Sequence, residues 1–229
     1  MLVGTEGLSR LAASKVVVVG VGGVGAMAAE MLVRAGIGHI VLIDSDTVSE
    51  SNLNRQIIAL RSTLGQSKCG VLSSRLLDIN PSLDISVVED FLAEDNVAAL
   101  VGSDASYVVD AIDTLSPKIA LAQHCIRLDI PLVSSMGSGA KSDATQVRIV
   151  DIGKTYECPL ARMMRKRLHK LGIDRGFLAV FSPELPDKRG MVIEETRNKK
   201  SQVGTISYLP AVFGCVCAQA VIRHIVGID

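Results

Sequence analysis

The chain contains no tryptophan, and only 3% of its 229 residues are aromatic. Recognition of nucleic acid by stacking of bases on an aromatic platform is therefore not expected. The 24 basic and 24 acidic residues cancel, which leaves a formal net charge of zero. A polyanion could then bind only to a local cluster of basic side chains, and not to the field of the whole molecule.

The sequence also lacks closely spaced cysteine pairs of the kind that bind zinc. None of the cysteines are spaced Cys-x-x-Cys, so no zinc site is expected. Their odd number and scattered positions are typical of reduced thiols and predict a cytoplasmic protein. Met1–Gly4 shows neither the basic start nor the apolar run of a signal peptide. The five cysteines are Cys69, Cys125, Cys158, Cys215 and Cys217.

Long hydrophobic runs are scarce. The most apolar segment, Leu209–Ile222, has about 14 residues, fewer than the 18 or more of a typical spanning helix. We therefore expect a buried helix in the core or in a dimer interface, with association at a membrane surface as the alternative. Cys215 and Cys217 lie in this segment and are expected to be core residues.

The composition, with 48% hydrophobic and 21% charged residues, is that of a globular protein. Over the first two thirds of the chain, predicted strands and helices alternate. This rhythm predicts an α/β fold, doubly wound, with a mostly parallel sheet, helices on both faces and a small C-terminal appendage. We expect a nucleotide-binding part over residues 1–150, and residues 151–229 as the C-terminal part of the same domain, with a basic helix, a mobile loop at Glu184–Gly204 and a closing apolar helix. The expected strands are 15–19, 40–43, 84–88, 107–110, 132–135, 146–150 and 178–181, and the expected helices are 24–35, 68–80, 94–101, 117–129 and 159–171.

A glycine-rich loop, Gly20–Gly25, follows the first predicted strand and opens the first predicted helix. Gly22 and Gly23 would let the backbone approach a phosphate that is held at the helix N-terminus. Asp44 ends the next strand, where a carboxylate can bind the hydroxyl groups of a ribose. These features predict a nucleotide site, and the fingerprint alone favours a nicotinamide or flavin cofactor.

Cations downstream of Asp44 favour a triphosphate instead, because they can stabilise the charge that develops on leaving pyrophosphate. Lys68 opens a predicted helix, and Asp113 follows a strand, where a carboxylate can hold magnesium between phosphates. Each residue alone could be a solvated surface charge, but all are expected at one edge of the sheet. The candidates after Asp44 are Asp46, Asn52, Arg55, Gln56, Lys68 and Asp113.

These motifs resemble the ubiquitin-activating-enzyme-like adenylyltransferase superfamily over roughly residues 8–150. They are Gly20-x-Gly22-Gly23-Val24-Gly25, Asp44-x-Asp46, Ser51-Asn52-Leu53-Asn54-Arg55-Gln56, Gly65-x-x-Lys68 and Asp110-x-x-Asp113. The resemblance implies that Asp44 binds the ribose of ATP, and that Asn52, Arg55, Gln56 and Lys68 bind its phosphates. Asp113 would serve Mg²⁺ and the adenylylation step. We therefore assign catalytic roles to Arg55, Lys68 and Asp113, ATP binding to Gly22, Gly23, Asp44, Asp46, Asn52 and Gln56, and a homodimeric state to the chain.

The second half of the chain is similar to the tRNA threonylcarbamoyladenosine dehydratase branch of this superfamily. The matching segments are 151–155, 158–161, 181–184 and 207–214. The resemblance implies ATP-dependent cyclisation of threonylcarbamoyladenosine in tRNA, with possible sulfur-transfer partners. Glu184–Gly204 contains no cysteine, which weakens thioester chemistry. The alternatives are an adenylyltransferase of a ubiquitin-like sulfur carrier and a non-catalytic nucleotide-binding protein.

Basic residues outside the glycine-loop region are the last group of candidates. The family places an arginine-rich segment ahead of the glycine loop and donates it across the dimer to ATP, where this chain offers only Arg10. The predicted helix 159–171 is basic and is either a solvated face or an RNA-binding surface. The candidate tRNA-binding residues are Arg162, Arg165, Lys166 and Arg167 on this helix, and Arg197, Lys199 and Lys200 in the following loop.

Overall fold

A computed structural model of the chain describes residues 2–187, 191–192 and 202–228. A seven-stranded sheet forms its centre, with the strand order β3-β2-β1-β4-β5-β7-β6. All neighbouring strands are parallel except β6, which pairs with β7 in the antiparallel sense. The strands are β1 (Lys15–Val19), β2 (His39–Ile43), β3 (Asp84–Val88), β4 (Tyr107–Asp110), β5 (Leu132–Ser135), β6 (Arg148–Asp151) and β7 (Leu178–Phe181).

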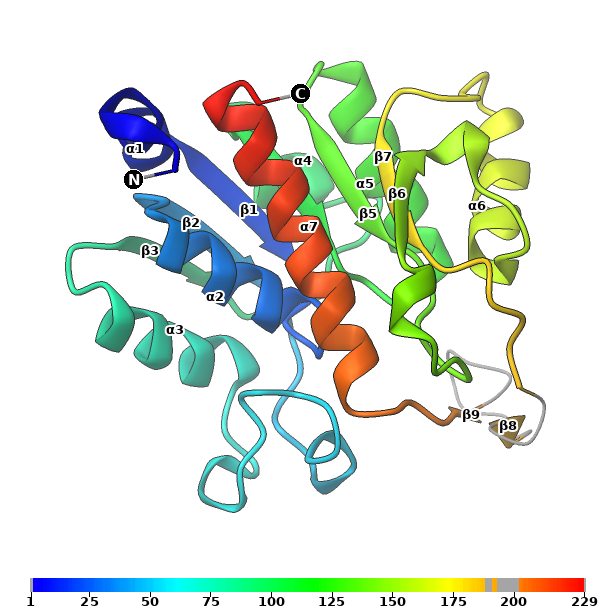
Figure 1. Cartoon of the computed structure of the whole chain (residues 1–229), viewed down its shortest axis with the longest axis horizontal. Coiled ribbons are helices and arrows are strands. Elements are labelled where there is room, and N and C mark those ends of the chain that lie inside the picture. Colours follow the sequence, from blue (N-terminus) through cyan, green and yellow to red (C-terminus); the bar gives the residue numbers. More distant parts are fainter. Residues whose placement is uncertain (1, 188–190, 193–201, 229) are drawn as a thin grey trace.

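Helices cover both faces of the sheet (Figure 1). One layer contains α1 (Gly4–Ala13), α2 (Gly25–Ala35), α3 (Lys68–Ile79) and α7 (Tyr208–Val226), and the other contains α4 (Val97–Val101), α5 (Leu115–Arg127) and α6 (Pro159–His169). Alternate residues of β1 supply the two cores: Val16 and Val18 face the first layer, Val17 and Val19 the second. The doubly wound α/β architecture predicted from the sequence is therefore confirmed.

The order of the strands locates the place where a ligand would bind. The chain winds from β1 outward to β3, and then returns to place β4 on the other side of β1. The connections after β1 and β4 therefore diverge at the carboxyl ends of these strands. Such a divergence leaves a crevice, which is the usual ligand site of an open α/β sheet.

Most element boundaries agree with the sequence-based expectations, and several differ for local reasons. The strand expected at 146–150 begins at Arg148, because Asp143 caps a short turn, Ala144–Gln146, by accepting the N–H of Thr145. The helix expected at 94–101 is reduced to α4, since the side chain of Asn96 holds the preceding loop at Ala93. The helix α1 was not predicted, and the remaining connections include η1 (Glu50–Asn52), η2 (Arg61–Thr63) and η4 (Ile152–Lys154).

The last helix, α7, is longer than expected and has 19 residues. Among the described residues it is the one helix that is long and apolar enough to cross a membrane, and 44% of its apolar window is buried. It packs against α2 so closely that a Cβ on Gly214 would lie 2.5 Å from the carbonyl oxygen of Val24. In this fold α7 is a core helix; Cys217 is buried as predicted, whereas Cys215 is exposed.

Most of the loop predicted at Glu184–Gly204 lies outside the described residues. The described part includes two short strands, β8 (Met191–Val192) and β9 (Gln202–Val203), which pair in the antiparallel sense. Arg197, Lys199 and Lys200 also lie outside the described residues, so their predicted contact with tRNA stays a prediction.

Candidate functional site

The glycine loop turns tightly between β1 and α2. Gly20 has a φ of +88°, a left-handed conformation that favours glycine. A Cβ on Gly25 would lie 1.8 Å from the carbonyl oxygen of Gly20, so no other residue fits at the start of α2. The N–H of Ala26 bonds to the carbonyl oxygen of Gly22, so the loop leads directly into the helix. The start of α2 thus lies at the glycines, where the positive end of the helix dipole favours an anion.

The predicted phosphate contacts Gly22 and Gly23 face different surroundings. A Cβ on Gly22 would meet only Nε2 of Gln56, at 3.7 Å, so this side of the loop is open. A Cβ on Gly23 would lie 3.0 Å from Cβ of Pro210 in α7 and 3.1 Å from the carbonyl oxygen of Arg55. The loop is thus closed on one side and accessible on the other, as a phosphate cradle requires.

Asp44 connects the end of β2 to the glycine loop. Its Oδ2 accepts the N–H of Val21 at 2.6 Å, and its Oδ1 accepts the N–H of Asp46 at 2.8 Å. Lys68, the first residue of α3, is buried along its stem, and its Nζ lies 2.6 Å from Oδ2 of Asp46 and 3.9 Å from Oδ1 of Asp44. Three residues predicted separately are therefore neighbours at the edge of the sheet.

The turn at 49–56 brings the next group of candidates to the loop. Asn52 is buried, and its Oδ1 accepts the N–H of Ser49. Gln56 follows one turn later and lies beside Gly22. The Nη1 of Arg55 donates to the carbonyl oxygen of Ser51, and also to Oδ1 of Asn54. The predicted site residues 44–68 therefore converge on one side of the glycine loop.

Asp113 belongs to the loop that follows β4, on the other side of the glycine loop. This loop is held close, because Ala111 donates its N–H to Val19 and a Cβ on Gly20 would lie 2.8 Å from the carbonyl group of Ala111. The side chain of Asp113 is exposed, two residues beyond this contact. The structure therefore places Asp113 at the same crevice as Asp44 and Lys68, from the opposite side.

Two residues beneath this loop were not predicted as part of the site. Asp110 and Lys118 are both fully buried, and Nζ of Lys118 lies 2.9 Å from Oδ2 of Asp110. Lys118 follows Pro117 in the sequence, and its neighbours give no indication that it would lie in the core. Asp110 could have been found from the sequence, because it is the first aspartate of the motif Asp110-x-x-Asp113. No such motif marks its partner, Lys118.

Two buried oxygen atoms indicate that the crevice fits a polar ligand. Among the described residues, Oε1 of Gln56 and Oγ1 of Thr114 are buried and accept or donate no hydrogen bond. They flank the crevice, since Gln56 lies beside Gly22 and Thr114 follows Asp113. Unsatisfied buried groups are unusual in native proteins, and a bound nucleotide would supply partners here.

The same geometry fits magnesium held mainly by the nucleotide. In the described part of the chain, no group of three or more His, Cys, Asp or Glu side chains could hold a metal ion. Mg²⁺ is commonly bound by one or two carboxylates together with substrate phosphates, and an exposed Asp113 suits that arrangement. The expected absence of zinc stays a prediction.

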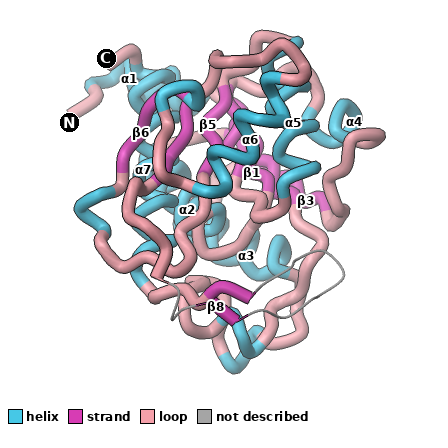
Figure 2. Tube along the Cα trace, turned by 90° about the vertical axis from the view of Figure 1, so that its right-hand side faces the viewer, coloured by secondary structure: helices cyan, strands magenta, loops and turns pink. Residues whose placement is uncertain are grey.

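The basic helix α6 lies beside α5, on the opposite face of the sheet from α7 (Figure 2). Arg162, Lys166 and Arg167 are exposed, while Arg165 is half-buried and donates to Oγ1 of Thr155. A surface hollow between α6 and the start of α5 is lined by Leu115, Met163, Lys166, Arg167 and Lys170.

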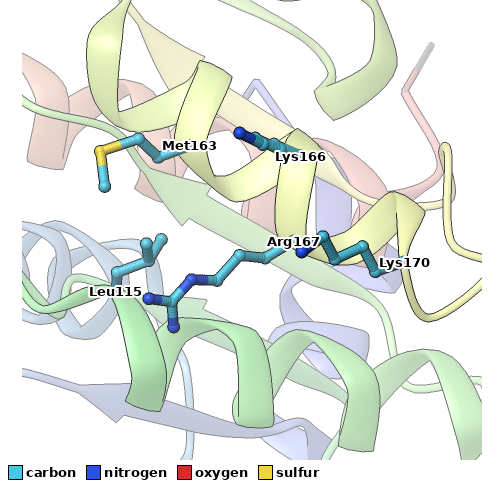
Figure 3. Close-up of a pocket in the computed structure, with 5 residues that line it drawn as sticks. All are labelled: Leu115, Met163, Lys166, Arg167 and Lys170. Atoms are coloured by element: carbon cyan, nitrogen blue, oxygen red, sulfur yellow. The ribbon is translucent and has the colours of Figure 1, made fainter.

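In this hollow, Met163 and Arg167 extend from α6 toward Leu115 (Figure 3). Nη1 of Arg167 also lies 3.2 Å from Oγ of Ser116. Because Leu115 comes two residues after Asp113, the hollow begins next to the crevice. A second hollow also lies along α6, lined by Arg162, Arg165 and Lys166 among others. At the crevice, the case for a ligand depends on the unsatisfied oxygens and the glycine loop.

Arg10 does not reach the crevice of its own chain. It lies in α1 and pairs with Glu6 one turn earlier. The helix α1 lies beside the start of β1 and the end of α7, whereas the glycine loop follows the other end of β1 (Figure 1). Arg10 therefore lies away from the site that residues 20–113 of its own chain form.

Comparison with known proteins agrees with this geometry. A sequence profile of the ThiF family matches residues 1–229. The chain is 39% identical to a tRNA threonylcarbamoyladenosine dehydratase of Bacillus subtilis, over 98% of this chain and 92% of that protein. It is also 37% identical to a SAMP-activating enzyme E1 of Haloferax volcanii, but over 68% of this chain and 57% of that protein.

Among solved structures, the chain is similar to the tRNA N6-threonylcarbamoyladenosine dehydratase of Escherichia coli in complex with ATP. The TM-score is 0.91 and the identity 39%, over 99% of this chain and 91% of that one. The similarity extends over the glycine loop, the residues at 44–68, the Asp113 loop and α6.

Proposed function

The chain belongs to the ThiF family, and on this premise we propose that it catalyses the ATP-dependent dehydration of N6-threonylcarbamoyladenosine in tRNA. The observation that carries the proposal is the convergence of the glycine loop, Lys68 and Asp113 on one crevice. This arrangement supplies a phosphate cradle, a cation and a carboxylate, which are the parts that activation of a carboxylate by ATP requires. The near full-length similarity to dehydratases of Bacillus subtilis and Escherichia coli supports the choice of substrate.

In the proposed reaction, an oxygen of the substrate carboxylate attacks a phosphorus atom of ATP. A nitrogen of the carbamoyl group then attacks the activated carbonyl carbon and gives up its proton to solvent. The ring closes as the phosphate or AMP group departs with the carboxylate oxygen. Attack at the α-phosphorus gives an acyl-adenylate and pyrophosphate, whereas attack at the γ-phosphorus gives an acyl-phosphate and ADP. Either route removes the elements of one water from the nucleoside.

The chain's own residues have separate roles in this scheme. Asp44 would bind the ribose, supported by Asp46, while the N–H groups at Gly22 and Gly23 and the side chains of Asn52 and Gln56 would hold the nucleotide. Arg55 and Lys68 would stabilise charge that grows on the phosphates as the carboxylate attacks. Asp113 would hold the magnesium ion, which when bound neutralises phosphate charge.

We propose that tRNA docks along α6. The helix presents Arg162, Lys166 and Arg167 to solvent, and its hollow begins near Asp113. Basic side chains would contact the phosphate backbone, and the apolar floor of Leu115 and Met163 suits the face of an unstacked base. Arg165 is less suited than predicted, because it is half-buried and already donates to Thr155.

A direct experiment incubates the protein with ATP, Mg²⁺ and tRNA that carries threonylcarbamoyladenosine. Mass spectrometry of the digested nucleosides should show loss of one water, only when ATP is present. Tight NADH binding without ATP binding would instead indicate a dehydrogenase and would refute the proposal.

The alternative within the family is adenylylation of the C-terminal glycine of a small sulfur-carrier protein. Thioester chemistry in that branch needs a reactive thiolate. Burial raises the pKa of Cys69, Cys125 and Cys217 to about 12, so these thiols stay protonated and unreactive. Conversion of a carrier protein, and not of tRNA, in the experiment above would favour this alternative. No turnover of either would favour a non-catalytic nucleotide-binding protein, and the sulfur-transfer partners stay a prediction.

We further propose that the protein works as a cytoplasmic homodimer. The outer side of α7 carries the exposed Cys215 and the half-buried apolar side chains of Val212, Val216 and Ile222. An apolar surface of this kind is more stable when a partner covers it. Sedimentation of the purified protein, with and without tRNA, would test the oligomeric state.

A further inference from the structure

The loop that carries Asp113 is held from below by a buried ion pair. Nζ of Lys118 lies 2.9 Å from Oδ2 of Asp110, and it donates to the carbonyl oxygen of Ser135 at 2.8 Å and to the carbonyl oxygen of Ile112 at 3.0 Å. The ammonium therefore has three oxygen neighbours, two of them carbonyl oxygens that accept its N–H groups and one a carboxylate oxygen that balances its charge. Oδ2 of Asp110 also accepts the hydroxyl of Ser134 at 2.5 Å.

Ile112, the residue directly before Asp113, is held at both of its backbone groups. Its N–H donates to Oδ1 of Asp110 at 3.1 Å, while its carbonyl oxygen accepts from Lys118. Ala111 is fixed in turn by its N–H bond to Val19 and its contact with Gly20. The path of the backbone is thus determined up to the residue from which the Asp113 side chain departs.

Stability alone gives a weak account of this pair. Lys118 and Asp110 are both 0% exposed, and the desolvation of two such charges commonly cancels the attraction between them. Lys118 also lies in the first turn of α5, where the helix dipole disfavours a cation. A pair of apolar side chains would fill this space without either cost, but it could not hold the carbonyl oxygen of Ile112.

From this arrangement we infer that Lys118 is a positioning residue. Together with Asp110 it fixes Ile112, so that the carboxylate of Asp113 is presented to the phosphates and magnesium of the nucleotide. The inference rests on the proposed function for the identity of the ligand. Lys118 itself is buried and touches no substrate; it acts through Asp113.

The central experiment is a double-mutant cycle with Lys118→Met and Asp113→Asn. Loss of an outer partner of a metal-binding side chain typically costs about 10- to 100-fold in affinity or activity. We expect a fall of that size in kcat for Lys118→Met, with little change in the affinity for ATP without magnesium. The increase in ATP affinity on addition of Mg²⁺, measured by calorimetry without tRNA, should be reduced in both single variants. In the Asp113→Asn background, Lys118→Met should add little, because the side chain that it positions is already altered.

Two further variants keep this test decisive. Lys118→Met leaves Asp110 as a buried charge without its cation, and this variant could fail to fold. The double variant Asp110→Asn/Lys118→Met removes both charges and replaces it in that case. We expect the double variant to show the same loss of the magnesium effect. Lys141→Met removes another buried lysine, which donates to the carbonyl oxygen of Ser182 at 2.6 Å, and it should keep the magnesium effect.

Wild-type turnover and a normal magnesium effect in a folded Lys118 variant would overturn the inference. So would full additivity with Asp113→Asn, which would indicate general damage to the fold. Because calorimetry needs no tRNA, failure of the proposed tRNA reaction would appear separately, as absence of turnover in the wild-type protein that still binds magnesium and ATP.

Discussion

The Nζ of Lys68 lies 2.6 Å from Oδ2 of Asp46. The lysine is almost fully buried, whereas the side chain of Asp46 is 68% exposed. The buried stem and the carboxylate together hold the ammonium at the mouth of the crevice, where a phosphate could share it with Asp46. The pairing is therefore compatible with a lysine that serves a nucleotide, and Asp46 keeps it in place before the nucleotide arrives.

Replacement of Lys68 by alanine should lower kcat by about 10²-fold or more, because a cation aimed at charge that develops in the transition state is lost. The rate of ATP turnover with modified tRNA is the measurement. Asp46→Asn should have a smaller effect, since it removes only the restraint on the lysine. Lys15→Ala is a suitable control: Lys15 also forms an ion pair, with Asp104 at 2.8 Å, but at the opposite end of β1. Full activity of Lys68→Ala would show that the phosphates lie elsewhere.

Substitution of Gln56 should weaken ATP binding without lowering the stability of the protein. Its Oε1 is buried and has no partner among the described residues, so Gln56→Met should leave the melting temperature unchanged or raise it. The affinity for ATP should fall by about tenfold, because one hydrogen bond to the ligand, worth roughly 1.5 kcal/mol, is lost. Thermal unfolding and calorimetry measure the two effects. Gln123→Met, at an exposed position of α5, is the control and should change neither. A melting temperature that falls together with unchanged ATP affinity would mean that Gln56 is only a structural residue.

Much of the fold and half of the crevice could be predicted from the sequence, because the signals there are local. The β-branched run at Lys15–Val19, the glycines after it and Gly36 at the end of α2 each dictate the conformation of their own segment. Lys68 could be assigned to a helix start, since Ser67 caps α3 by accepting the N–H of Gly70.

The residues that sequence reasoning missed depend on distant parts of the chain. Lys118 is buried only because β4 and β5 place Asp110 and the carbonyl oxygen of Ser135 around its ammonium. Cys215 and Cys217 share one apolar segment, and only the packing of α7 on α2 decides which of them is buried. Hydrophobic periodicity and composition describe single segments, so they do not predict contacts of this kind between distant segments.

Removal of two charges, one from α6 and one from its C-cap residue, should weaken tRNA binding and flatten its dependence on salt. Lys166 and Lys170 both line the hollows of α6, and each phosphate contact that is lost should reduce the slope of log K against log [salt] by about one unit. Binding of tRNA to Lys166→Ala/Lys170→Ala, measured over a range of salt concentrations, tests this. ATP affinity should not change, since α6 lies outside the glycine-loop crevice.

The matched control for this experiment removes the same charge elsewhere. Lys15 begins β1 and Arg127 ends α5, both far from the carboxyl edge of the sheet. Lys15→Ala/Arg127→Ala should bind tRNA like the wild-type protein. If both double variants lost tRNA affinity equally, the loss would be due to the change in net charge alone. The basic face of α6 would then be only a solvated surface.

The last prediction concerns the pH dependence of stability, through Glu30 of α2. Burial opposes the ionisation of this carboxyl group, but hydrogen bonds from Arg75 and Arg34 outweigh that effect and lower its pKa below 4.5. Nε of Arg75 lies 2.6 Å from Oε2, which ties α3, and with it Lys68, to α2. Because the pKa is lower in the folded state than in the unfolded state, the contribution of Glu30 to stability is present above the unfolded pKa. It is lost as the pH falls through the folded value.

The variant Glu30→Gln should therefore be less stable than the wild-type protein at about pH 7, by roughly 1.5–3 kcal/mol, the usual contribution of a hydrogen bond to a charged group. The difference should shrink as the pH falls below 4.5 and through the lowered pKa of the folded state, because wild-type Glu30 then becomes protonated. Urea unfolding at several pH values provides the measurement. Glu6→Gln is the control: Glu6 pairs with Arg10 at an exposed position of α1, where such pairs contribute only about 0.3–0.5 kcal/mol. A deficit in Glu30→Gln that stayed constant across this pH range would show that Glu30 stabilises the α2–α3 contact by packing and not by its charge.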